Sequence, residues 1–141
     1  MARIWLLLLC AVLTIWQPLS FAVEASSSLG TLGMRGAAGA VELVVHGAVA
    51  ALSAAAGWAL WQSSPGGPKL ARVAIVAGAI IGVQSLYATA LPSNVFPSDR
   101  LPLAMVTVIH AALWIAYLWR STRIRAIENP EPATSSIRFS R

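Results

Sequence analysis

The chain has 141 residues, of which 57% are hydrophobic and only 11% are charged, and its mean hydropathy is +0.72. Soluble domains carry about 25% charged residues, so this composition excludes an ordinary soluble domain and indicates an integral membrane protein. Ten Lys and Arg residues against five Asp and Glu would also suit nucleic acid, but most of them flank apolar segments, where they act as topology signals. We therefore expect no nucleic-acid partner.

The first segment, residues 1–22, allows two interpretations. Arg3 precedes an apolar run of signal-peptide length, residues 4–16, and Ser20-Phe21-Ala22 resembles a cleavage site. These features predict a secretory signal peptide that is removed before Val23. The alternative is an uncleaved first transmembrane helix, because the apolar stretch from residue 4 to about residue 23 is just long enough to span a bilayer.

Two polar residues interrupt the next apolar segment. Residues 23–36 are rich in Ser and Gly and predict an exposed loop, after which residues 37–61 have membrane-spanning length. That segment contains Glu42 and His46, which lie four positions apart and so share one helical face. An ionisable group at membrane depth costs a few kcal/mol unless it is paired, so we expect both side chains to face inward.

Two further apolar segments, residues 70–91 and 101–119, complete the predicted fold. Two prolines and two glycines between residues 62 and 69 end the preceding helix and predict a tight hairpin. Gly78 and Gly82 form a GxxxG pattern, which predicts close helix packing against the small residues of the preceding span. The predicted fold is all-α and polytopic: an antiparallel bundle over residues 37–119 of three transmembrane helices (37–61, 70–91 and 101–119), plus an N-terminal signal peptide or a fourth transmembrane helix.

The C-terminal segment, residues 120–141, is basic at its start and then rich in Pro, Glu and Ser, so we expect a largely disordered tail. Arg120, Arg123 and Arg125 directly follow the last span. By the positive-inside rule they place the C-terminus in the cytoplasm and residues 23–36 outside, and they are suited to contact anionic lipid headgroups. The compact loops and the signal-like start favour a bacterial-type inner membrane.

Counting depth along the helices predicts one intramembrane polar cluster. At about 1.5 Å per residue, the two histidines lie level with each other near the bilayer centre, and the other polar side chains lie within a few turns of them. Their inward orientation is inferred from the cost of exposing polar groups to lipid, because sequence does not fix the rotation of each helix. The expected members of the cluster are Glu42, His46, Gln84, Tyr87, Thr107 and His110.

Three functions are compatible with this cluster. The first, which we favour, is a small accessory or interaction subunit of a membrane assembly, in which the cluster is structural and the partners are the lipid bilayer with other membrane subunits or further copies of the chain. In the second, His46 and His110 are the axial ligands of a b-type haem in electron transfer. In the third, an oligomer carries protons or cations through Glu42 and His46.

Enzyme chemistry is not expected. The sequence holds no GxSxG, no phosphate-binding loop and no HExxH, so no catalytic residues are assigned. Its single cysteine, Cys10, excludes an intrachain disulfide, and no Cys/His spacing resembles a structural metal site. The sequence therefore predicts a non-enzymatic membrane protein without a metal site built from Cys and His motifs, while haem b stays possible as a cofactor.

Overall fold

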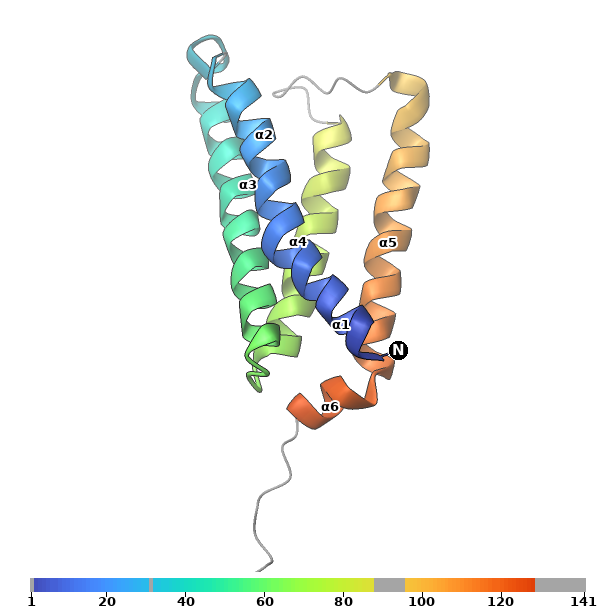
Figure 1. Cartoon of the computed structure of the whole chain (residues 1–141). Helices are drawn as coiled ribbons and strands as arrows, with labels where there is room; N and C mark the ends of the chain where they lie inside the picture. The colour runs from blue at the N-terminus through green and yellow to red at the C-terminus, as the bar shows by residue number, and fades with distance from the viewer. Residues whose placement is uncertain (1, 31, 88–95, 129–141) are drawn as a thin grey trace, which may run out of the picture.

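The computed structural model describes residues 2–30, 32–87 and 96–128 (Figure 1). Within these ranges the secondary structure is helical, with no strand. The elements are α1 (Ala2–Ala11), the π-helical turn η1 (Val12–Trp16), α2 (Gln17–Leu29), α3 (Leu32–Trp61), α4 (Gly67–Tyr87), the 3₁₀ turn η2 (Pro97–Asp99), α5 (Arg100–Arg120) and α6 (Thr122–Glu128).

Among the described residues, four helical segments are long and apolar enough to cross a membrane: Ile4–Leu29, Gly36–Trp61, Gly67–Tyr87 and Pro97–Arg120. This finding confirms the predicted all-α polytopic fold. The third segment begins three residues earlier than the predicted start at residue 70, because Pro68 is tolerated in the first turn of a helix. The predicted end of that span at residue 91 lies outside the described residues.

The N-terminal helices form one continuous rod. α1, η1 and α2 cross the other helices diagonally, so that α2 lies beside α3 while the start of α1 lies near the far end of α5 (Figure 1). Leu9 and Leu13 of this rod are almost fully buried. At Gly57 of α3 the approach is so close that an added Cβ would overlap the Thr14 side chain and lie 3.1 Å from the Cys10 carbonyl oxygen. Residues 4–29 therefore contribute to the core of the bundle.

The exposed loop predicted for residues 23–36 is wrong over most of its length. α2 continues to Leu29, and α3 is already helical from Leu32. Ser26 and Ser27 donate their hydroxyl protons to the carbonyl oxygens three residues earlier, each at 2.8 Å, which is a back-bonding arrangement that a helix tolerates. The chain bends instead at Gly36, whose φ of 63° suits glycine.

The hydrophobic core occupies one half of the bundle. Its buried residues come from α1, η1, the end of α3, the start of α4, the end of α5 and α6, which all gather at the end of the molecule where the N-terminus lies (Figure 1). Trp114 makes edge contacts there with Trp5 and Tyr117, at ring-centroid distances of 6.3 and 6.0 Å. The opposite half of the bundle has a more polar interior.

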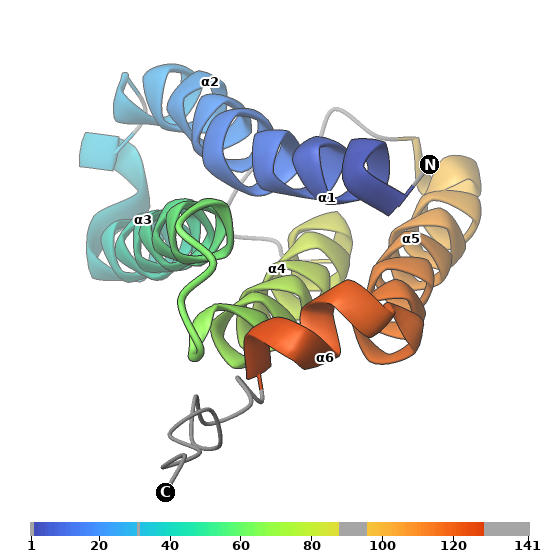
Figure 2. The ribbon, with the colours of Figure 1, turned by 60° about the horizontal axis from the view of Figure 1, so that its bottom comes forward.

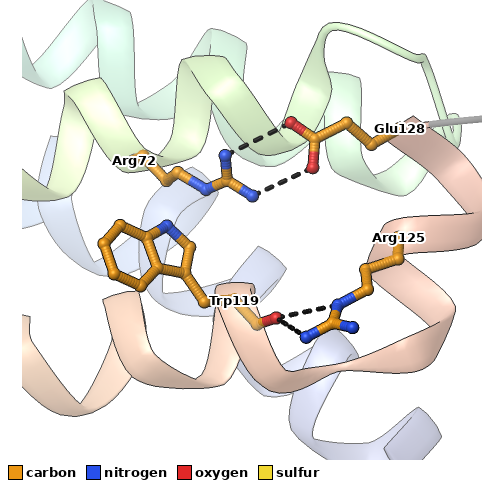
Figure 3. Close-up of polar contacts among 4 residues, drawn as sticks. All are labelled: Arg72, Trp119, Arg125 and Glu128. Carbon is orange, nitrogen blue, oxygen red and sulfur yellow. Dashed lines mark hydrogen bonds and ion pairs between the residues drawn. The ribbon is translucent and has the colours of Figure 1, made fainter.

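The tail predicted to be disordered begins instead with a packed helix. α6 turns back across the end of the bundle after Ser121, and Ile124 is fully buried (Figure 2). Arg72 of α4 donates through Nη1 and Nη2 to the two carboxylate oxygens of Glu128, at 3.2 and 3.0 Å (Figure 3). One apolar anchor and one bidentate ion pair thus hold a segment whose composition suggested disorder. Residues 129–141 of the predicted tail lie outside the described residues.

Candidate functional site

The centre of the candidate site is a close contact between a histidine and a carboxylate on two helices. His46 Nδ1 of α3 lies 2.9 Å from Oε1 of Glu24 on α2, and the imidazole is buried while the carboxylate is about one-third exposed. Glu42, which was predicted to share a helical face with His46, does not make this contact. Residues four apart share a helical face, but α2 packs alongside that face and supplies the nearer carboxylate (Figure 1).

A cavity of about 260 Å³ is lined by both of these side chains. It lies in the half of the bundle away from the hydrophobic core and is bounded by α2, α3, α4 and α5. Its apolar wall includes Trp16, Phe21 and Ile81. The polar residues that line it are Gln17, Ser20, Glu24, His46, Ser85 and Thr107.

The two glycines of the GxxxG pattern also border this cavity. An added Cβ at Gly78 would lie 3.3 Å from Nε2 of Gln17, and one at Gly82 would lie 3.4 Å from Cγ2 of Thr107. Their neighbours are therefore side chains of α2 and α5, whereas the sequence suggested the small residues of α3. The missing side chains make room for polar groups that line the cavity.

The predicted six-residue cluster is divided. His46 and Thr107 line the same cavity, but Gln84 and Tyr87 are exposed and do not line it. Glu42 is half-buried, and its Oε1 has no hydrogen-bond partner within the described part of the chain. The depth estimate placed these residues at similar heights, but the rotation of each helix, which sequence does not fix, turns several of them away from the cavity.

His110, the second predicted histidine, has a different environment. It is exposed on α5, and its Nε2 accepts a hydrogen bond of 2.9 Å from the indole N–H of Trp114. It lines an apolar groove of about 490 Å³ together with Trp5 and Tyr117. It also lines a small cavity of about 70 Å³, which shares Gln17, Gly78 and Thr107 with the 260 Å³ cavity around Glu24 and His46.

These positions do not fit a shared haem. Axial ligation needs two imidazoles facing one another across a single pocket. His46 and His110 line different cavities among the described residues, and each has one ring nitrogen engaged by a neighbouring side chain. The arrangement therefore gives no haem pocket between the two histidines.

The basic residues at and after the end of α5 are only partly available for lipid. Arg125 donates through Nε and Nη2 to the carbonyl oxygen of Trp119, both at 3.1 Å, and so caps the end of α5 (Figure 3). Arg120 is exposed. The side chain of Arg123 is not among those that the structure describes. A lipid headgroup would thus have to compete with the Trp119 carbonyl for the guanidinium of Arg125. The position of Arg125 in the sequence did not indicate this capping interaction.

Sequence reasoning missed four residues of the cavity wall: Gln17, Ser20, Glu24 and Ser85. A signal for three of them was present. Gln17, Ser20 and Glu24 are spaced at i, i+3 and i+7, which places them along one face of a helix. That stripe was not apparent because residues 1–22 and 23–36 were assigned to a signal peptide and a loop.

The fold and the cavity together define an all-α polytopic protein with a polar interior in one half of its bundle. Comparisons of the chain with protein-family models, with curated proteins and with solved structures find no match. The function is therefore argued from the geometry of this chain.

Proposed function

We propose that the protein is a small accessory subunit of a membrane assembly and that it contacts its partner through the exposed face of α5 around His110. One observation carries this proposal. Because Nε2 of His110 accepts the Trp114 hydrogen bond, the neutral imidazole holds its own proton on Nδ1. Within the described residues, Nδ1–H has no acceptor.

The depth of His110 makes this unpaired donor costly. The residue lies ten positions after Arg100, which is about 15 Å along the helix and close to the middle of a bilayer core of about 30 Å. Its neighbours Val106, Ile109 and Leu113 are large, apolar and more than half exposed. Polar groups at this depth are almost always paired with protein or water, so we infer that a partner helix supplies the acceptor. One such bond contributes about 0.6 to 1.7 kcal/mol to helix association in membranes.

The same proposal includes retention of residues 1–22 as a fourth transmembrane helix. The close packing of this rod against Gly57 and the burial of Leu9 and Leu13 support retention. With four spans both ends of the chain lie on one side, and the basic residues before the first span and after the last favour the cytoplasm for that side. We propose a bacterial-type inner membrane as the location.

Proton or cation transport, the third function considered, receives less support than an accessory role. Beyond the cavity around Glu24 and His46 and the small one that adjoins it, the hydrophobic core occupies the end of the bundle that holds the N-terminus. A path through it would have to pass fully buried apolar side chains such as Leu9, Leu60 and Leu118. The cavity is therefore better suited to binding than to passage.

A photocrosslinking experiment in native membranes tests the proposal. A photoreactive phenylalanine at Leu113 should give a protein adduct of defined mass, different from that of a dimer of this chain. The same group at Val44, an exposed residue of α3, should not give it. Adding His110→Leu should reduce the yield several-fold. Crosslinks to lipid alone, or only to a second copy of the chain, would contradict an accessory role.

A further inference from the structure

The hydroxyl groups that line the cavity share one property: each donates its proton to a backbone carbonyl of its own helix. Ser20 donates to the Trp16 carbonyl at 2.8 Å and Ser85 to the Gly82 carbonyl at 3.0 Å. Thr107 donates in the same way, to the Leu103 carbonyl at 2.9 Å. Each hydroxyl oxygen therefore offers only lone pairs to a molecule in the cavity.

The charged groups of the wall point to the same chemistry. Glu24 and His46 are its titratable residues, and no Lys or Arg is among the described residues that line it. When Nδ1–H of His46 donates to Glu24, Nε2 of the neutral ring is a further acceptor. Among the described side chains of the wall, the donors that are left for a ligand are the Gln17 amide and the Trp16 indole. The wall is thus rich in acceptors and carries a carboxylate.

We propose that this cavity binds a small protonated amine, either ammonium or a short alkylammonium ion. The N–H groups of such an ion would donate to the hydroxyl oxygens, and its charge would be balanced by Glu24. The aromatic rings of Trp16 and Phe21, which line the same cavity, suit a cation with a short alkyl group. The cavity volume of about 260 Å³ is large enough for an ion of this size.

Other ligand classes fit the wall less well. An anion would meet acceptors and a carboxylate, so its binding would be opposed electrostatically. A divalent metal usually requires several His, Cys, Asp or Glu ligands, and no group of three such residues converges among the described residues. A singly charged cation with N–H donors is the ligand class that best fits a cavity lined by acceptors and one carboxylate.

The test compares two cations of equal charge. Purified full-length protein in detergent is titrated with methylammonium chloride, which has N–H donors, and with tetramethylammonium chloride, which has none, at constant ionic strength. Methylammonium should raise the melting temperature saturably, whereas tetramethylammonium and potassium chloride should not. An equal effect of all three salts, or no effect of methylammonium, would overturn the proposal.

Variants localise the effect. Thr107→Val removes one acceptor at nearly constant shape and should weaken methylammonium binding several-fold while leaving the unliganded melting temperature close to that of the parent. Glu24→Gln should weaken binding at least tenfold. Glu42→Gln is the matched control, because Glu42 is a carboxylate on α3 that does not line the cavity. Loss of binding in this control, or full binding by Thr107→Val and Glu24→Gln, would show that the ion binds elsewhere.

Discussion

Glu24 and His46, separated by 22 positions in the chain, are joined by a 2.9 Å contact that fastens α2 to α3 in the polar half of the bundle. His46 is buried and has this carboxylate as its partner. Polar contacts between membrane helices are individually weak, but a buried group that loses its partner bears the cost of desolvation.

The first prediction concerns this pair. His46→Ala and Glu24→Ala should each lower the free energy of unfolding, and the double variant should lose less than the sum of the two. We expect a coupling of about 0.5 to 2 kcal/mol. Denaturant unfolding of the four proteins in mixed micelles measures it. Strict additivity would mean that the two side chains do not interact. The combination of His46→Ala with Arg120→Ala, which changes an exposed residue at the end of α5, provides the additive reference.

The second prediction tests the closest helix approach. Gly57→Leu should destabilise the bundle by about 1 to 3 kcal/mol, because its side chain would overlap Thr14 of the N-terminal rod. Gly66→Ala is the control, since nothing lies within 4 Å of a Cβ added there. Melting temperatures of the two variants measure the difference. Equal stability of Gly57→Leu and the parent would show that the rod does not pack against α3 in this way.

The third prediction concerns the attachment of α6. Arg72→Gln removes the bidentate contact with Glu128 and should loosen residues 122–128, with a modest loss of about 1 kcal/mol because both side chains are partly solvent-accessible. Hydrogen exchange of the α6 amides should become faster. The exchange of charges, Arg72→Glu with Glu128→Arg, should restore much of the protection. Arg120→Gln, which changes an exposed arginine of α5, should leave it unaltered.

Hydropathy and helix breakers were enough to predict the fold. Apolar length located the spans within a few residues, and the prolines and glycines around Gly66 located the hairpin between α3 and α4. Composition was misleading where a polar segment is held by contacts that are distant in sequence. The Arg72–Glu128 pair fixes α6, and the Glu24–His46 contact joins the Ser-rich half of α2 to α3.

The candidate site was less predictable. Spacing correctly placed Glu42 and His46 on one helix, but it did not indicate which neighbouring helix faces His46. Counting residues gives the depth of a side chain in the membrane, but whether two side chains touch also depends on how each helix is rotated about its axis. For this reason Thr107 reached the cavity and Gln84, at comparable depth, did not.

The last prediction decides between the two interpretations of residues 1–22. The helix that contains the predicted cleavage site continues to Leu29, and residues Ile4–Leu29 form one segment of 26 residues that is long enough to span a membrane. Cleavage before Val23 would remove Leu9 and Leu13 from the core and Gln17 and Ser20 from the cavity. Intact-mass spectrometry of the purified protein should therefore show a chain that begins at Met1 or Ala2.

A mature N-terminus at Val23 would contradict retention and would remove part of the wall of the proposed amine site. Replacing Ala22 by a bulky residue such as Leu provides the control, because it blocks recognition of a small-residue cleavage site. If the parent is already retained, Ala22→Leu should leave the intact mass unchanged apart from the substitution itself. If the parent is cleaved, the variant should instead be heavier than the parent by the mass of the first 22 residues. The mature parent would then be a bundle of three spans.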